Sequence, residues 1–210
     1  MRAIEAHTID HVMTLAPVIP VLVVEDVSQA RPIAEALVAG GLPVLEVTLR
    51  TPAALEVVAE MAKVEGALVG AGTVLNAGQL HGAIAAGARF IVSPGLTKPL
   101  ARAATDRNIP FLPGIATAGD IMRGLDLGLD RFKFFPAEAA GGIKALKSLA
   151  APFYRCRFCP TGGITAASAA DWLALDAVSC IGGSWLVPAG PVDTAAIYDR
   201  AVAAAKARAA

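Results

Sequence analysis

Eight short apolar runs recur along the chain, and this repetition constrains the fold more than any other feature. Each run leads into a turn with glycine or proline and then into a helical stretch rich in alanine and leucine. Successive midpoints lie roughly 21 to 26 residues apart, which is enough for one strand, one helix and two loops. The runs are Val18–Val24, Val44–Leu49, Ala67–Ala71, Phe90–Ser93, Phe111–Pro113, Arg131–Phe135, Arg157–Thr161 and Val178–Gly182.

The repeat predicts an α/β fold in which strands and helices alternate. We interpret residues 1–210 as one domain, a (β/α)8 TIM barrel with an extra N-terminal helix. A doubly wound open sheet uses the same units, but eight evenly spaced units favour closure into a barrel. Within residues 1–16, a helix at about Ala3–Leu15 is expected to cover the floor of the barrel, the end formed by the amino termini of the strands.

Capping side chains stand where several of the helices should begin. Thr51 precedes Pro52, and proline suits the first position of a helix. The other expected caps are Asn76, Thr97, Thr117 and Thr165. These positions place helix starts just after the runs, as the barrel requires.

Composition and charge exclude several classes of protein. The 18 basic residues equal the 18 acidic ones and form no cluster, so we expect neither a nucleic-acid partner nor a membrane partner. No apolar run reaches the roughly 18 residues of a membrane helix, and a hydrophobic content of 55% excludes disorder. Three cysteines, an odd count without a disulfide framework, predict a reducing compartment and a cytoplasmic protein.

The second run carries polar residues that a structural strand does not need. Active sites of TIM barrels lie at the carboxyl ends of the strands. Alternation along Val44–Leu49 turns Glu46, Thr48 and Arg50 toward the barrel interior and the apolar residues between them toward the helices. Arg50 taken alone could equally reach solvent at the end of the strand.

The sixth run adds a lysine to the same interior. Alternation along Arg131–Phe135 places Lys133 on the same face as Phe135. Charged side chains are rarely buried without a partner or a purpose. One alternative is an internal ion pair between Glu46 and Lys133 that only neutralises itself, although such pairs stabilise proteins poorly compared with apolar packing.

Small residues follow three further runs. Gly70, Gly72 and Thr73 end the third run, where glycines would let a ligand approach the backbone; a satisfied turn threonine explains Thr73 equally well. The third glycine of a dinucleotide fingerprint is missing here.

Glycine pairs follow the seventh and eighth runs. They are Gly162-Gly163 and Gly182-Gly183, the second followed by Ser184. A TIM barrel binds phosphate at this place through backbone N–H groups. Tight turns explain either pair alone, but not their occurrence on two neighbouring strands.

Other reactive residues are poor candidates for a metal site. Cys156 and Cys159 are offset by three residues and therefore point to opposite faces of a strand. His7 and His11 fall in the N-terminal helix, and His81 falls inside a later helix. With no histidine expected at the barrel mouth, we expect neither a metal nor another cofactor.

These residues together predict an aldolase. Burial among aromatic rings favours the neutral form of an amine, and a neutral Lys133 could form a Schiff base with a ketone. Glu46 would carry protons, and Arg50 would bind a carboxylate. The substrate would then be a 2-oxo acid with a phosphate at its far end.

The sequence resembles the 2-keto-3-deoxy-6-phosphogluconate (KDPG) aldolase / 4-hydroxy-2-oxoglutarate (KHG) aldolase family. The resemblance runs from about Pro17 to Pro188. The stretches that carry it are PVIPVLVVEDV, ALVAGGLPVLEVTLRTPAA, VGAGTVLN, IVSPGLT, FKFFPAE, GGIKALK, RFCPTGGI and CIGGSWLVP.

The resemblance implies a role for each candidate residue. Lys133 would form the Schiff base, and Glu46 would act as general acid and base. The implied binding residues are Arg50 and Thr73 for the substrate carboxylate, Pro94, Phe135 and Thr161 for the pocket, and Gly162, Gly163, Gly183 and Ser184 for the phosphate. The products would be pyruvate and glyceraldehyde 3-phosphate, the last step of the Entner–Doudoroff pathway. Cleavage of 4-hydroxy-2-oxoglutarate and a homotrimeric assembly are further implications.

Three other functions remain as alternatives. An aldolase for the galactonate epimer shares the same residues, since a single hydroxyl contact separates the two substrates. A deoxyribose-phosphate type of aldolase would leave Arg50 without a carboxylate to bind. A non-catalytic phosphate-binding barrel would be expected to have lost Lys133 or Glu46, and both are present.

Overall fold

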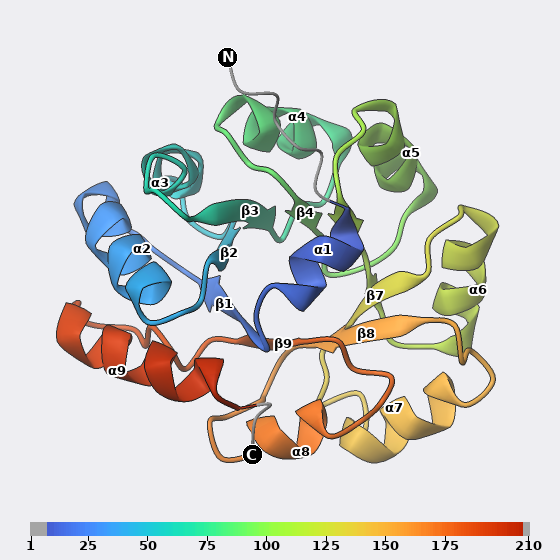
Figure 1. The fold of residues 1–210 in the computed structure, drawn as a ribbon. Coiled ribbons are helices and arrows are strands. Elements are labelled where there is room, and N and C mark those ends of the chain that lie inside the picture. Colours follow the sequence, from blue (N-terminus) through green and yellow to red (C-terminus); the bar gives the residue numbers. More distant parts are fainter. Residues whose placement is uncertain (1–7, 208–210) are drawn as a thin grey trace.

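The computed structural model describes residues 8–207 as a curled parallel sheet surrounded by helices, a TIM-barrel-like α/β fold (Figure 1). The strands are β1 (Val18–Leu22), β2 (Val44–Thr48), β3 (Leu68–Gly72), β4 (Ile91–Val92), β5 (Phe111–Leu112), β6 (Gly114–Ile115), β7 (Arg131–Phe134), β8 (Arg157–Pro160) and β9 (Ile181–Gly183). The helices are α1 (Ile9–Thr14), the short 3-10 helix η1 (Val27–Gln29), α2 (Ala30–Ala39), α3 (Ala54–Met61), α4 (Ala77–Ala85), α5 (Lys98–Asp106), α6 (Ala118–Asp126), α7 (Gly142–Ala150), α8 (Ala169–Leu173) and α9 (Thr194–Ala205).

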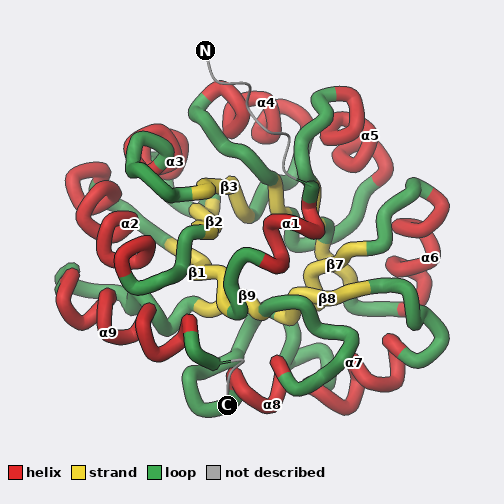
Figure 2. Tube along the Cα trace, in the orientation of Figure 1, coloured by secondary structure: helices red, strands yellow, loops and turns green. Residues whose placement is uncertain are grey.

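The strands form two parallel groups. One has the order β5-β4-β3-β2-β1-β9, and the other has the order β6-β7-β8. Isolated bridges pair Phe158 with Val178 and Thr161 with Gly182, so β8 lies beside β9. Helices α2 to α9 lie outside this ring of strands, whereas α1 lies across one end of it (Figure 2). None of the helices within residues 8–207 is long and apolar enough to cross a membrane.

The fifth run differs from the single strand that the sequence predicts. It is divided at Pro113: β5 pairs with β4, whereas β6 pairs with β7. Proline has no N–H for a ladder, so the strand is interrupted where its pairing partner changes. On either side of Pro113, β5 and β6 together still occupy the place of one strand between β4 and β7.

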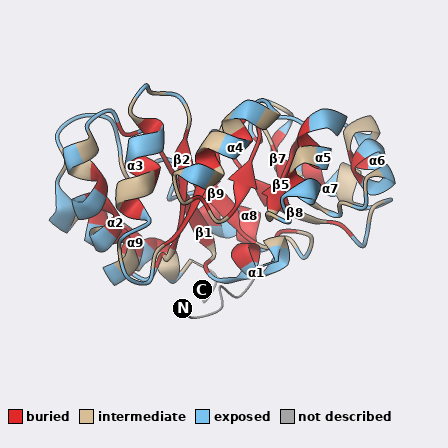
Figure 3. Cartoon of the chain, turned by 90° about the horizontal axis from the view of Figure 1, so that it is seen from above, coloured by how far each residue is buried: buried red, intermediate tan, exposed pale blue. Residues whose placement is uncertain are grey.

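Alternation along the strands separates two apolar clusters. Leu45 and Val47 belong to the outer cluster, between strands and helices, whereas Val44 belongs to an inner cluster enclosed by the strands. Phe132 and Phe134 also lie in the outer cluster. The predicted orientations of β2 and β7 are therefore confirmed. Figure 3 shows the buried residues concentrated in the strands and on the helix faces that cover them.

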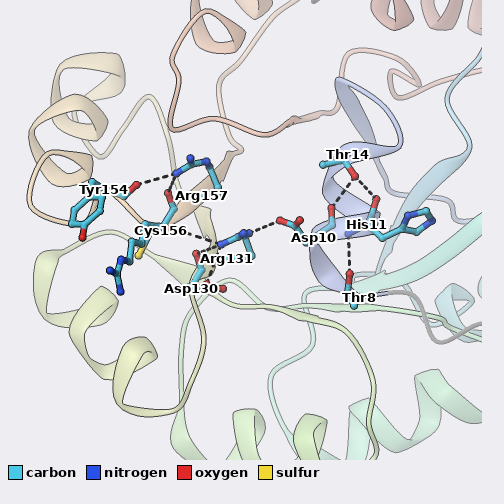
Figure 4. Close-up of polar contacts among 10 residues, drawn as sticks. Thr8, Asp10, His11, Thr14, Asp130, Arg131, Tyr154, Cys156 and Arg157 are labelled. Atoms are coloured by element: carbon cyan, nitrogen blue, oxygen red, sulfur yellow. Dashed lines mark hydrogen bonds and ion pairs between the residues drawn. The ribbon is translucent and has the colours of Figure 1, made fainter.

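Helix α1 closes one end of the inner cluster. Its Val12 and Met13 are fully buried against residues from the amino-terminal parts of the strands. Arg131, the first residue of β7, donates from Nε to the Asp10 carboxylate at 2.5 Å (Figure 4). The helix expected at about Ala3–Leu15 thus spans Ile9–Thr14 in the structure, and positions 3–7 lie outside the described residues.

Predicted helix starts agree with the structure only in part. Three of the expected residues occupy N-cap positions, namely Asn76, Thr97 and Thr117. The prediction was wrong for Thr51 and Thr165, because α3 and α8 begin further along the chain. The Thr51 hydroxyl instead donates to the carbonyl of Val24 at 2.9 Å, a contact between two loops that local sequence does not reveal.

Candidate active site

A lysine and a glutamate meet inside the ring of strands. Lys133 extends from β7 and Glu46 from β2, and Lys133 Nζ donates to Glu46 Oε1 at 2.9 Å. Their side chains are only 6% and 4% exposed. The structure thus brings together the two charged residues that alternation predicted to face the interior.

Room for Glu46 comes from a glycine on the neighbouring strand. A Cβ at Gly72 of β3 would lie 2.2 Å from Glu46 Oε1, so any larger residue would displace the carboxylate. Two positions earlier, a Cβ at Gly70 would lie 2.5 Å from the Phe90 ring. Side chains of the protein therefore occupy the space beside both glycines, and the approach of a ligand to their backbone stays a prediction.

The surroundings of the pair are largely apolar. The inner cluster fills the ring on the side of α1, and the Phe135 ring centroid lies 5.5 Å from Lys133 Nζ. Thr48, which shares the interior face of β2, donates its hydroxyl to the carbonyl of Leu22 at 2.8 Å. In such a poorly hydrated site, electrostatic interactions act strongly on a developing charge.

Arg50 and Thr73 lie together at the ends of neighbouring strands. Arg50 Nε donates to Thr73 Oγ1 at 3.3 Å, just beyond β2 and β3. Thr73 has a φ of +56°, a left-handed conformation that costs a non-glycine residue roughly 1–2 kcal/mol. Arg50 is exposed at the mouth of the ring, the end formed by the carboxyl ends of the strands. A guanidinium in this place can bind a carboxylate.

Pro94 lies in the turn after β4, close to the backbone of Gly114, a contact that the sequence did not reveal. Ser93 donates its hydroxyl to the carbonyl of Gly95 at 2.6 Å, which fixes the turn after β4. A Cβ at Gly114 would lie 2.1 Å from the carbonyl oxygen of Pro94. Gly114, the first residue of β6, is therefore required for this turn to lie against the ring.

The two glycine pairs lie on neighbouring strands, as predicted. Gly162 and Gly163 follow β8 with φ of +106° and +81°, which is the conformational range that favours glycine. Thr161, which precedes them, is bridged to Gly182 of β9. A Cβ at Gly182 would lie 2.3 Å from Thr161 Oγ1, so this glycine admits the threonine side chain.

Ser184 lines a cavity beside this site. The cavity has a volume of about 700 Å³ and lies between the end of β1, η1, α2 and the segment after β9. Gly183, next to Ser184, is buried, and a Cβ there would lie 2.4 Å from the Trp185 ring. Ser184 itself is exposed.

The residues rejected as metal ligands are separated in the structure. Cys156 belongs to the outer cluster and Cys159 to the inner one, as their offset predicted. Burial raises the pKa of the Cys156 thiol. His11 lies in α1 and His81 in α4, and His7 is outside the described residues. Within residues 8–207, no group of three His, Cys, Asp or Glu side chains is placed to hold a metal ion.

Sequence comparison places these features in a known family. Residues 9–200 match the family model for KDPG and KHG aldolase. A 2-dehydro-3-deoxy-phosphogluconate aldolase of Zymomonas mobilis subsp. mobilis is 62% identical over 189 residues, or 90% of this chain and 91% of that protein. The KHG/KDPG aldolase of Escherichia coli K12 is 56% identical over 192 residues, or 91% of this chain and 90% of that protein.

Solved structures agree with the sequence comparison. The KDPG aldolase of Zymomonas mobilis ZM4 with 3-phosphoglycerate has a TM-score of 0.93 and 61% identity, covering 94% of each chain. The KDPG aldolase from Legionella pneumophila, with pyruvate captured as a covalent carbinolamine intermediate, has a TM-score of 0.92 and 44% identity, covering 95% of this chain and 98% of that one. By sequence and by structure, this chain belongs to the KDPG and KHG aldolase family.

Proposed function

We propose that this chain cleaves KDPG to pyruvate and glyceraldehyde 3-phosphate through a Schiff base, without a metal or other cofactor. The observation that carries this proposal is the buried contact between Lys133 Nζ and Glu46 Oε1 at 2.9 Å. The names and the high identity of the Zymomonas mobilis and Escherichia coli relatives support KDPG as the substrate. The reaction would be the last step of the Entner–Doudoroff pathway.

The geometry of the pair suits each proton transfer of this reaction. Lys133 gives a proton to Glu46, and its neutral amine attacks the ketone of the substrate. Glu46 then protonates the departing hydroxyl, which leaves as water and gives the iminium. Removal of the proton from the C4 hydroxyl by the carboxylate breaks the C3–C4 bond, releasing the aldehyde and leaving an enamine. Protonation of that enamine at carbon and hydrolysis of the imine release pyruvate. The carbinolamine in the Legionella pneumophila relative supports this sequence of steps.

Arg50 and Thr73 are proposed to bind the carboxylate of the pyruvyl half. Their hydrogen bond at 3.3 Å presents a cation and a hydroxyl together at the mouth. Pro94, Phe135 and Thr161 are proposed to line the pocket between this carboxylate and the phosphate. The contact of the Phe135 ring with Lys133 Nζ at 5.5 Å supports its place in that pocket.

The phosphate is proposed to bind at the two glycine pairs. Gly162, Gly163 and Gly183 would donate backbone N–H groups, and Ser184 would donate its hydroxyl. Positive φ values at Gly162 and Gly163 suit a concave anion site. The 3-phosphoglycerate in the Zymomonas mobilis ZM4 structure supports a phosphorylated three-carbon ligand.

Three further properties belong to the same proposal. We propose that the strand groups close into one complete barrel of eight units with α1 as an extra helix on its floor, and the bridge between Thr161 and Gly182 supports closure. The name of the Escherichia coli relative supports KHG cleavage as a second activity. A cytoplasmic homotrimer is the proposed form in the cell. Light scattering on a sizing column would give the assembly.

The first experiment is borohydride reduction in the presence of pyruvate. We expect a pyruvyl adduct on Lys133, located by intact mass and peptide mapping, because borohydride reduces the imine to a stable secondary amine. The Lys133→Ala variant should carry no adduct. A folded wild-type protein without an adduct would overturn the Schiff-base mechanism. An adduct without KDPG cleavage would keep the Schiff base and overturn only the assignment of the aldehyde that is released.

A further inference from the structure

The loop that follows β7 lies directly against the glycine pair that follows β8. The N–H of Ala137 donates to the carbonyl of Thr161 at 2.8 Å. The N–H of Glu138 donates to the carbonyl of Gly162 at 3.1 Å. The loop after β7 thus binds the carbonyls of Thr161 and Gly162 and holds one side of the glycine segment.

The side chain of Glu138 continues this contact beneath Gly163. A Cβ at Gly163 would lie 2.7 Å from Glu138 Cγ and 2.8 Å from its Cβ, so the glycine rests on the glutamate stem. At the end of the stem, Glu138 Oε1 accepts a hydrogen bond from Nε1 of Trp172 at 3.0 Å. Trp172 lies in α8 and is fully buried, which makes it a rigid anchor. Glu138 therefore connects the glycine segment to the helix layer.

We propose that Glu138 is a positioning residue that holds Gly162 and Gly163 in the conformation that receives the substrate phosphate. The inference rests on the proposed assignment of these glycines to phosphate binding. Two successive glycines have large conformational freedom, and fixing them on binding would cost free energy. If Glu138 fixes the segment before the ligand binds, less conformational entropy is lost on binding.

The proposal predicts an effect on one half of the substrate only. The carboxylate of Glu138 is directed to α8 and not to the Lys133–Glu46 pair, whose hydrogen bond lies within the ring. Loss of the Glu138 contact should raise KM for phosphorylated KDPG. It should leave unchanged the reactions of pyruvate alone, which carries no phosphate.

Three variants distinguish the effect of the hydrogen bond between Glu138 and Trp172 from the effect of the Glu138 side chain itself. Glu138→Ala removes the acceptor and the stem, whereas Trp172→Phe removes the donor and part of a buried ring but keeps Glu138. Glu138→Gln keeps an amide oxygen that can accept from Trp172 Nε1. Ser168→Ala is the matched control, because its hydroxyl lies on the same connection before α8 and bonds only within Thr165–Ser168.

The experiment measures KDPG cleavage and exchange of pyruvate methyl protons with D2O for each variant. We expect KM for KDPG to rise by up to about tenfold in Glu138→Ala and Trp172→Phe, as for loss of one side-chain hydrogen bond. The exchange rate with pyruvate should stay at the wild-type value in both. Glu138→Gln and Ser168→Ala should behave as wild type in both measurements.

The outcomes distinguish this inference from the proposed function. Equal losses in cleavage and exchange, or an unchanged KM for KDPG in both Glu138→Ala and Trp172→Phe, would overturn the positioning role. Trp172→Phe alone decides if Glu138→Ala does not fold, since it preserves the glutamate. Absence of exchange and cleavage in the wild type would instead overturn the proposed function itself.

Discussion

At the scale of single residues, the buried Lys133–Glu46 pair is the feature that structure alone does not justify. Taking a lysine and a glutamate out of water costs more free energy than apolar side chains of similar volume would. Their hydrogen bond at 2.9 Å offsets only part of this cost. The pair is therefore best explained by chemistry, since each proton that moves in the proposed reaction can pass between these two groups.

Glu46→Gln tests that explanation, because the amide keeps the shape but cannot carry a proton. We expect kcat for KDPG cleavage to fall at least about 100-fold, while circular dichroism stays that of the wild type. Glu60→Gln is the control, since Glu60 is a carboxylate on α3 that pairs only with Lys63 on the surface. Full activity in Glu46→Gln would remove Glu46 from the mechanism.

Gly72→Ala tests the space that the carboxylate occupies. The added Cβ would lie 2.2 Å from Glu46 Oε1, so we expect the carboxylate to move away from Lys133 and kcat to fall about 100-fold. Gly119→Ala is the matched control, because a Cβ at that position meets its nearest neighbour at 3.5 Å. Equal kcat values in the two variants would contradict the proposed role of Gly72.

At the scale of elements, sequence patterns predicted which way side chains of a strand point better than which atoms of adjacent elements they contact. Alternation in β2 and β7 was enough to predict that Glu46 and Lys133 face the same interior, because side chains of a strand point to its two faces in turn. The roles of Gly72 and Gly114 could not be predicted in this way. Each depends on which atoms of an adjacent element, Glu46 Oε1 or the Pro94 carbonyl, lie over the glycine.

Helix starts show the same division between local and tertiary signals. Thr117 caps α6, and a capping box with Asp120 forms within four residues. Burial alone would raise the pKa of Asp120, but hydrogen bonds from the Thr117 hydroxyl, the N–H groups of Ala116 and Thr117, and Arg123 together lower it. Because this pKa is lower in the folded state, the stabilisation is present above about pH 4 and is lost as pH falls through the lowered value.

Asp120→Asn tests this contribution. We expect the variant to lose about 1 kcal/mol of unfolding free energy at pH 7, as for loss of a helix cap. The difference from wild type should be smaller at pH 3, because below about pH 4 the carboxyl of the unfolded chain binds protons more readily than that of the folded state. Urea unfolding at both pH values measures it, with Asp126→Asn at the other end of α6 as control. A difference that is equal at both pH values would contradict the assigned cause.

At the scale of the whole molecule, the apolar inner cluster and the proposed substrate-binding residues lie at opposite ends of the ring of strands. The inner cluster joins α1 to the amino-terminal parts of the strands, whereas Arg50, Thr73 and the Gly162-Gly163 pair follow carboxyl ends and Gly183 is the last residue of β9. The repeat of strands and helices predicted this polarity, since parallel strands bring all their carboxyl ends to one side. It could not predict the link from Glu138 to Trp172, which joins residues 34 positions apart through a side-chain hydrogen bond.

Met13→Ala tests the separation of the two ends. Met13 is fully buried in the inner cluster, so its truncation should cost about 2–5 kcal/mol of unfolding free energy. We expect kcat/KM for KDPG to remain at the wild-type value at 25 °C, because the residue lies on the side of the ring away from the mouth. Leu15→Ala, at a position 39% exposed just after α1, should change neither quantity strongly. A loss of kcat/KM in folded Met13→Ala would mean that packing at the floor also positions the Lys133–Glu46 pair, and the two ends would then act as one unit.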